Sequence, residues 1–240
     1  MTLVRRTTRA LALTREGMAY RDRMMVLLTD MMELETGLGE ERGAPRGVLR
    51  INASPSFGVE WLIPMLPDFR ARYPAVRIDL TLSDAIVDLV EERADIAIRI
   101  GPLRDMRLRA KKLGHSRMAL VASPDYLARR GTPATPNDLA GHDCLRFSFR
   151  RSVDSWPFRL GRKTVQLPVE GAYFGNSGEV VRQMAVAGCG IARHGYFHVA
   201  RDLEAGRLIE ILADYAVGDG EDIHALYAAE DRTAARVGAF

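Results

Sequence analysis

The hydrophobic positions between residues 15 and 42 recur at alternating steps of four and three. They are Tyr20, Met24, Leu27, Met31, Leu34 and Leu38. A period of 3.5 residues is typical of a coiled-coil seam, so we predict a linker and dimerisation helix over 15–42. The alternative is a helix that packs on its own domain. Gly39, Gly43 and Pro45 end the pattern and separate this helix from the next segment, which favours a partner helix.

From residue 48 onward the pattern changes to alternating strands and helices. Alternating or continuous apolar runs predict strands at 48–54, 76–82, 94–101 and 118–123. A helical period predicts helices at 59–73 and 85–93. The order strand, helix, strand, helix, strand indicates βαβ units, and therefore a parallel sheet with helices on its faces.

A second unit of strands and helices is predicted between residues 123 and 222. We expect helices at 124–130, 136–140 and 177–187, a further short helix within 192–205, and a strand at 208–212. The stretches CLRFSF and TVQLPVEG are interpreted as strands on either side of a Gly161-Arg162 turn. A strong strand pattern at 223–229 comes after this unit, and a helix begins near Thr233.

Composition places the chain among ordinary globular proteins. It has 240 residues, of which 47% are apolar and 27% charged, enough for one or two domains with a sizeable core. There is no apolar run of membrane-spanning length and no signal peptide, so we expect a cytoplasmic protein without a membrane partner. Cys144 and Cys189 lack metal or redox spacing, which predicts two reduced structural cysteines.

The positive charge is concentrated at the start of the chain. Residues 1–23 hold six Arg against two acidic residues, a local charge of +4, while the whole chain carries +3. Charge at one end favours contact with nucleic acid more than a high overall isoelectric point does. In this segment LALT is expected to be a strand, and Thr14 is expected to cap the following helix.

No residue set favours catalysis or a cofactor. His194 and His198 are spaced i,i+4, but they lack a carboxylate third ligand, so we expect no metal. Ligand binding has better support. The segments 53–58 and 176–179 each place Ser residues at a helix start, where hydroxyl caps and free N–H groups favour an anion. In open α/β sheets, ligands bind outside the carboxyl ends of the strands. Plain helix capping is the alternative.

The order of these segments resembles the LysR-type transcriptional regulators over essentially the whole chain. The resemblance is carried by RRTTRALALTREG, INASPSFG, LIPMLPDFRARYPAVRIDL and VVRQMAVAGCGIA, in this order and spacing. One departure is ARHGYF (192–197), which stands where the family has a more apolar run with a proline. Another is that the family's recognition helix lies further upstream, so we expect the chain as written to lack it.

The resemblance implies an α/β fold similar to the type 2 periplasmic binding proteins, with two subdomains, two crossover strands as a hinge, and a long linker helix in front. The implied division is a remnant of a winged helix-turn-helix (1–14), the linker helix (15–42), effector subdomain I (47–122 plus 223–240) and effector subdomain II (123–222). The cleft between the subdomains would bind the effector.

The resemblance also implies the site residues. A small organic effector, often an anion, would contact Ser54, Ser56, Phe57, Arg99, Ile100, Gly101, Val121, Ala122, Ser123, Asn176, Ser177, Gly178 and His194. DNA phosphates would contact Arg5, Arg6 and Arg9, which position a protein on DNA without reading its sequence.

The function implied is effector-controlled regulation of transcription by a homodimer or homotetramer that binds DNA. Two alternatives remain open from the sequence. The first is a stand-alone effector-binding and dimerising protein without sequence-specific DNA binding. The second is a solute-binding protein, which the missing signal peptide disfavours. An enzyme is the least favoured class.

Overall fold

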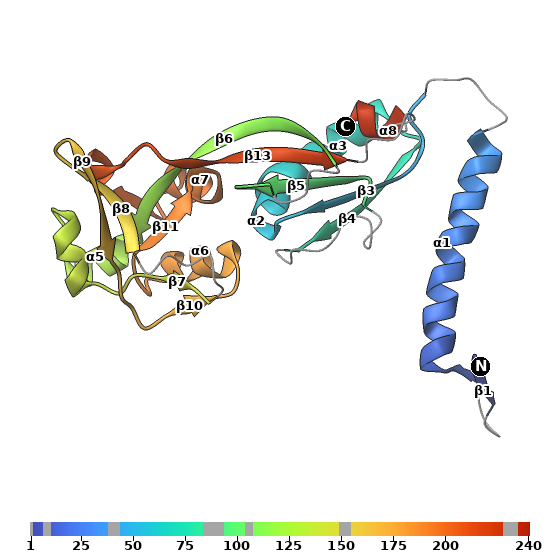
Figure 1. Cartoon of the computed structure of the whole chain (residues 1–240), viewed down its shortest axis with the longest axis horizontal. Coiled ribbons are helices and arrows are strands. Elements are labelled where there is room, and N and C mark those ends of the chain that lie inside the picture. Colours follow the sequence, from blue (N-terminus) through green and yellow to red (C-terminus); the bar gives the residue numbers. More distant parts are fainter. Residues whose placement is uncertain are drawn as a thin grey trace.

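The computed structural model describes residues 2–6, 11–37, 44–83, 94–103, 108–148, 155–227 and 235–240. Figure 1 shows a small N-terminal hairpin, one long helix, and an α/β body drawn out along a pair of long strands. The body has two parts. We call the part that contains β3 to β5 and α8 subdomain I, and the part between α5 and β12 subdomain II.

The N-terminal hairpin consists of β1 (Val4–Arg6) and β2 (Leu11–Leu13), which pair antiparallel and lead into α1 (Arg15–Gly37). The Thr14 Oγ1 accepts a hydrogen bond of 2.9 Å from the Gly17 N–H, so the predicted cap is confirmed. Glycine is required at position 17, because a Cβ there would lie 1.8 Å from the Leu3 carbonyl oxygen. The hairpin therefore packs directly on the first turn of the helix.

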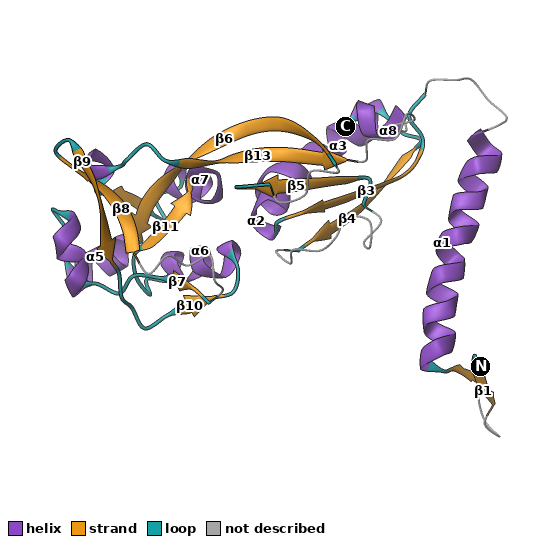
Figure 2. Ribbon diagram, in the orientation of Figure 1, coloured by secondary structure: helices purple, strands orange, loops and turns teal. Residues whose placement is uncertain are grey.

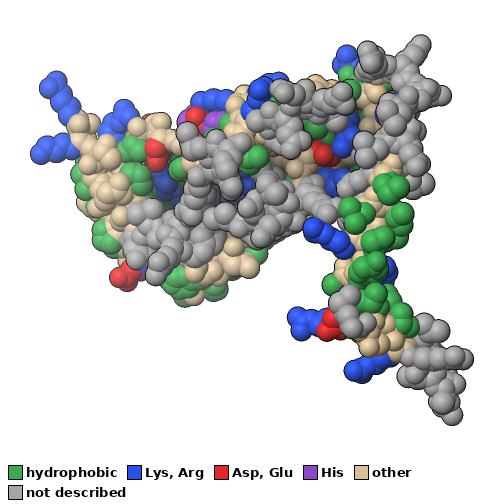
Figure 3. Space-filling view, turned by 45° about the vertical axis from the view of Figure 1, so that its right-hand side comes forward, with side chains coloured by type: hydrophobic (Ala, Val, Ile, Leu, Met, Phe, Trp, Pro, Cys, Tyr) green, Lys and Arg blue, Asp and Glu red, His purple; other side chains and the backbone are tan. Residues whose placement is uncertain are grey.

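The predicted seam of α1 is largely uncovered in the single chain. Tyr20, Leu27 and Met31 are 46–56% exposed, and Met24 is half-buried. Figure 3 shows hydrophobic side chains along the helix, which stands apart from the α/β body. Leu38 and the side chain of Leu34 lie outside the described residues. An exposed apolar stripe of this kind is typical of a surface that packs on another helix.

Subdomain I is a parallel sheet in the order β4-β3-β5. Its elements are β3 (Gly47–Ala53), α2 (Pro55–Phe57), a π-helical turn (Gly58–Leu62), α3 (Ile63–Arg72), β4 (Val76–Leu82), β5 (Ile96–Ile100) and the C-terminal α8 (Ala235–Ala239). The predicted helix 85–93 lies outside the described residues. The predicted strands and the helix over 59–73 are confirmed, and the helix begins earlier, at Pro55.

The hydrophobic core of subdomain I holds the helix that follows β3 against the sheet. Leu49 and Ile51 of β3 are buried against Ile98 of β5 and Leu62. Glycine at position 58 allows this packing, because a Cβ there would lie 2.1 Å from a Leu82 methyl carbon. The start of the helix is therefore held at the carboxyl end of the sheet.

Two long strands connect the subdomains, as Figure 2 shows: β6 (Arg109–Ala122) and β13 (Gly220–Tyr227), which pair antiparallel. The predicted strand at 118–123 covered only the end of β6. The earlier residues, RAKKLGH, are mostly exposed because they span the gap between two cores, and so they carry no apolar alternation. The predicted pair of crossover strands is consistent with this arrangement.

Subdomain II is built on the far ends of the crossover strands. Its elements are α5 (Pro124–Arg130), a 3-10 helix (Pro136–Gly141), β7 (Arg146–Phe147), β8 (Ser155–Leu160), β9 (Lys163–Pro168), β10 (Phe174–Gly175), α6 (Gly178–Val186), β11 (Ala192–Gly195), α7 (Tyr196–Glu204), β12 (Ile209–Ile211) and a 3-10 turn (Ala213–Tyr215). Both β11 and β12 pair with β6.

One prediction for subdomain II was wrong in detail. The strand that pairs with β9 is β8, not CLRFSF, whose residues 146–147 pair with β10 instead. Pro157 inside β8 masked the strand pattern, since proline is rare in strand interiors. The short helix expected within 192–205 is confirmed as α7, which begins at Tyr196 because 192–195 pair with β6.

No helix in the described ranges is both long enough and apolar enough to span a membrane.

Candidate functional site

The first turns of α2 and α6 meet at the boundary between the two subdomains. The Ser56 hydroxyl donates a hydrogen bond of 3.2 Å to Oε2 of Glu179. Ser177 caps α6, because its Oγ accepts a 3.2 Å hydrogen bond from the Val180 N–H. The two helix starts that the sequence singled out are therefore brought together, and Glu179 connects them.

Ser54 does not play the capping role that the sequence suggested. Its backbone has the extended conformation of an N-cap, but its hydroxyl makes no capping bond to the first turn of α2. The Ser54 Oγ is buried and has no hydrogen-bond partner among the described residues. Because a buried, unsatisfied hydroxyl is costly, this atom marks a place where a bound polar group would stabilise the protein.

Glu179 belongs to a chain of charges that the sequence did not reveal. Arg182 donates to both carboxylate oxygens of Glu179, at 3.0 and 2.7 Å, and to Oδ2 of Asp202 at 2.5 Å. Burial favours a raised pKa for Glu179, but the hydrogen bonds from Arg182 and Gln183 outweigh it and the pKa is lowered. The hydrogen bond to Glu179 is the main cause of the raised pKa of Arg182. Arg182 therefore bridges two carboxylates, and Arg207 supplies a second positive charge to Asp202 at 2.7 Å.

Three further contacts join the two subdomains near this chain of charges. The Trp61 Nε1 donates to the Phe197 carbonyl oxygen at 3.1 Å, and Arg201 pairs with Glu60 at 3.2 Å. The rings of Phe57 and Phe197 lie 6.0 Å apart, edge to face. Phe197 comes from α7 of subdomain II, yet it is part of the hydrophobic core of subdomain I. The predicted site residue Phe57 therefore lies at the boundary.

His194 lies behind the first turn of α6, together with a second histidine. Its side chain is 2% exposed, and its Nε2 has no partner among the described residues. Its ring lies 5.1 Å from that of His198, which packs against Gly178. Burial, and secondarily Arg182, lowers the pKa of His194 to about 4. Burial and the neighbouring His194 lower the pKa of His198 well below its usual range. Both rings are neutral at pH 7.

The described residues contain no group of three or more side chains suited to holding a metal ion.

The predicted residues at the end of β5 lie at the same edge of subdomain I. Arg99 donates to Oδ1 of Asn52 at 2.6 Å, and Ile100 packs against the core. Gly101 has a φ of +86°, a left-handed conformation that favours glycine, and its N–H donates to the Asp222 carbonyl oxygen. These residues end the strand close to β13.

Other predicted residues are not brought to the α2–α6 contact. Val121 and Ala122 are fully buried in the cores of subdomain II. The Ser123 Oγ accepts from the Tyr126 N–H and so caps α5; it lies beside Gly188, which follows the far end of α6 from Ser177. Asn176 is exposed beside Ser177.

The residues predicted to contact DNA lie in and beside the N-terminal hairpin. Arg5 is an exposed residue of β1, and Arg6 ends the same strand. Arg9 and the side chain of Arg6 lie outside the described residues.

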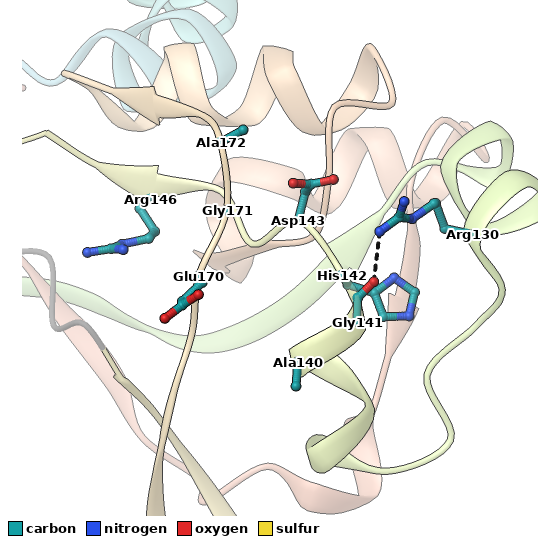
Figure 4. A pocket seen from close by; sticks show the side chains of 9 residues that line it. All are labelled: Arg130, Ala140, Gly141, His142, Asp143, Arg146, Glu170, Gly171 and Ala172. Carbon is teal, nitrogen blue, oxygen red and sulfur yellow. Dashed lines mark hydrogen bonds between the residues drawn. The ribbon is translucent and has the colours of Figure 1, made fainter.

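A separate cavity of about 650 Å³ lies in subdomain II, at the amino ends of β7 and β10 (Figure 4). Arg130, Asp143, Arg146 and Glu170 line it, together with His142. Figure 4 shows the Arg130 guanidinium reaching the Gly141 carbonyl oxygen, a hydrogen bond of 2.8 Å. Positive and negative side chains balance in this cavity, and it lies at the opposite ends of the strands from Ser177.

Comparison with known proteins places this geometry in context. The family model described as the LysR substrate binding domain matches residues 42–240. The HTH-type transcriptional regulator CrgA of Neisseria meningitidis is 37% identical over 225 residues, which cover 94% of this chain and 75% of that protein. The HTH-type transcriptional regulator DmlR of Escherichia coli is 31% identical over 98% of this chain and 76% of its own length.

Solved structures agree with the sequence comparison. The structure of CrgA, a LysR-type transcriptional regulator, superposes with a TM-score of 0.76 at 34% identity, covering 100% of this chain and 81% of that chain. The full-length structure of the Vibrio cholerae virulence activator AphB gives a TM-score of 0.71 at 28% identity, with the same coverage. The resemblance found in the sequence and the fold class it implied are therefore confirmed.

Proposed function

Because the chain belongs to the LysR family of transcriptional regulators, we propose that it controls transcription in response to a small organic effector bound between its two subdomains. The observation that carries the proposal is the buried, unpartnered Ser54 hydroxyl beside the contact between Ser56 and Glu179. A polar group of an effector would satisfy Ser54 and compete with Glu179 for Ser56. The first-turn N–H groups of α6 favour an acidic effector.

The proposed effector site is smaller than the set that the resemblance implied. We retain Ser54, Ser56 and Phe57 from α2 and its entry, and Ser177 and Gly178 from α6. Asn176 and His194 lie beside α6, and Arg99, Ile100 and Gly101 end the neighbouring strand β5. Val121, Ala122 and Ser123 support the fold of subdomain II by their burial and capping bond instead.

The remaining assignments come from the same family. Residues 1–14 form the end of a winged DNA-binding domain, with Arg5, Arg6 and Arg9 on DNA phosphates. The α1 helix pairs with that of a second chain through its exposed apolar stripe, which supports a homodimer or a homotetramer. The subdomain boundaries proposed are 47–122 with 223–240, and 123–222. As a regulator of transcription, the protein is proposed to act on DNA in the cytoplasm, and no cofactor is assigned to it.

A thermal-shift screen of small aromatic and aliphatic carboxylic acids tests the effector proposal. An acid present at a hundred times its dissociation constant adds about 2.7 kcal/mol to the free energy of unfolding. Alcohols of the same shape serve as controls for non-specific stabilisation. The proposal is contradicted if acids stabilise the protein no more than the alcohols do.

A further inference from the structure

The two histidines behind α6 form a pair in which each ring has one buried nitrogen without a hydrogen-bond partner in the part of the chain that the structure describes. His194 comes from β11 and His198 from α7, and their ring centroids are 5.1 Å apart. The Nε2 of His194 and the Nδ1 of His198 are both buried without a partner among the described residues. Two unsatisfied ring nitrogens in one place are uncommon in a folded protein and point to a ligand.

The pair adjoins the helix start that faces subdomain I. A Cβ on Gly178 would lie 2.5 Å from Cε1 of His198, so this ring packs directly against the first turn of α6. The next residue, Glu179, is the one that contacts Ser56. On the other side, the His198 ring lies 4.0 Å from that of Phe197, which packs into subdomain I. The pair therefore lies at the subdomain boundary.

Each charged side chain that faces the histidine pair has a partner of opposite charge. The histidines are therefore the groups near this helix start whose charge can change. On α6, Arg182 carries a positive charge and Glu179 a negative one, and Asp202 on α7 adds a negative charge that Arg182 and Arg207 neutralise. Phe147 of β7 faces His194 with an apolar ring, and Arg193 of β11 is paired with Asp219. From subdomain I, Ser56 is uncharged, and Glu60 is paired with Arg201 of α7.

An anion bound at the first turn of α6 would favour the protonated form of the nearby histidines. The N-terminal end of a helix favours a negative charge, and α6 has nine residues. A negative charge within about 4–6 Å of a histidine raises its pKa by about 1–3 units. Burial holds both rings neutral in the free protein. The anion would accept from the N–H groups at the helix start, and a proton that enters with it would turn one unpartnered ring nitrogen into an N–H donor for the anion.

We propose that His194 and His198 couple effector binding to proton uptake: the effector is a small oxyanion that binds at the first turn of α6 together with one proton, which a ring nitrogen of the pair receives from solvent. This inference rests on the proposed effector function and adds to it the class of ligand and its dependence on pH. ARHGYF, the segment that departs from the family pattern, supplies His194, and His198 follows it directly.

Calorimetry with benzenesulfonate tests the coupling, because this anion keeps its charge between pH 5 and 8. In wild-type protein we expect the affinity to rise toward tenfold for each unit of pH decrease while one proton is taken up. Titrations in two buffers of different ionisation enthalpy count that proton. The His194→Gln/His198→Gln variant should lose both the uptake and the slope. His115→Gln, a change on the exposed surface of β6, should retain them.

Nitrogen-15 NMR of the histidine rings in wild-type protein gives the same test without relying on a variant. At pH 6 we expect both rings to be neutral in the free protein, and one to become imidazolium at saturating benzenesulfonate. The proposal is overturned by rings that stay neutral, by affinity independent of pH, or by no saturable binding at pH 5. If an acid from the thermal-shift screen binds equally well at all pH values, the effector function stands and the proton coupling fails.

Discussion

Ser56 and Glu179 are separated by 123 residues in the sequence, yet their side chains share a 3.2 Å hydrogen bond across the two subdomains. The Glu179 carboxylate thus accepts the hydrogen bond from Ser56 that an acidic effector would otherwise accept. Arg182 holds that carboxylate in place, and Asp202 holds Arg182. One contact between the subdomains therefore rests on an ionic chain within subdomain II, and the proposed effector would have to compete with Glu179 for the Ser56 hydroxyl.

Asp202→Asn should be strongly destabilising. The carboxylate is 1% exposed and accepts hydrogen bonds from Arg182 and Arg207, so its replacement leaves a buried guanidinium without its full counter-charge. Breaking a buried pair costs about 3–5 kcal/mol, measured as the free energy of unfolding in urea. Asp219→Asn, which removes the partly exposed partner of Arg193, is the matched control and should cost at most about 1 kcal/mol. Equal losses would contradict the importance of the buried chain.

Gly178→Ala should also destabilise, for a steric reason. The added Cβ would meet the His198 ring at 2.5 Å, and both the ring and the helix start are held by their neighbours. Overpacking of this kind costs about 1–3 kcal/mol. Gly114→Ala is the control, because a Cβ there meets nothing within 4 Å. Thermal denaturation of the two variants measures the difference, and an unaltered melting temperature for Gly178→Ala would mean that His198 lies elsewhere.

The stability of the free protein should fall at mildly acidic pH because of His194. Its pKa is about 4 in the folded protein and about 6.5 when unfolded, so the unfolded chain binds the proton first as the pH falls. Stability is therefore full above about pH 6.5 and is lost between pH 6.5 and 4, by about 3 kcal/mol from this group. Urea titrations of wild type and His194→Gln at several pH values measure the difference. Parallel pH profiles would show that His194 does not carry this effect.

Met31→Glu should shift the chain from dimer toward monomer. Met31 is 56% exposed on the apolar stripe of α1, and pairing of two helices would bury the new carboxylate without a partner. Light scattering at micromolar concentration measures the mass. Ala19→Glu introduces the same charge outside the predicted seam and should leave the dimer intact. A dimer that survives Met31→Glu would place the interface on another surface.

The sequence predicted those features that depend on local residues. Thr14 and Ser177 were identified as caps because a hydroxyl next to a helix start needs only its own first turn. The apolar period of α1 and the βαβ order likewise depend on neighbours along the chain. These features indicated the fold class and the two helix starts that meet at the subdomain boundary.

The other features of the site depend on tertiary contacts, which a local sequence pattern does not predict. Asp202 lies in an ordinary amphipathic helix, and its burial is explained by Arg207 and by Arg182, which lies 20 residues earlier. Ser54 was expected to cap α2, but its hydroxyl has no partner among the described residues, and Ser56 is the serine that reaches across to Glu179. A charged residue at the first turn of a helix and an Arg three residues later were the available signal for Glu179 and Arg182.

An acidic effector is proposed to bind where α2 meets α6, and calorimetric titration of the strongest acid from the thermal-shift screen tests this central claim most directly. Ser56→Ala should weaken binding by about 1–2 kcal/mol through loss of one charge-assisted hydrogen bond, roughly 5- to 30-fold in the dissociation constant. Ser155→Ala, on the exposed β8–β9 hairpin, should leave the affinity unchanged. Equal affinities for wild type and Ser56→Ala would contradict the claim and remove the contact between α2 and α6 from the effector site.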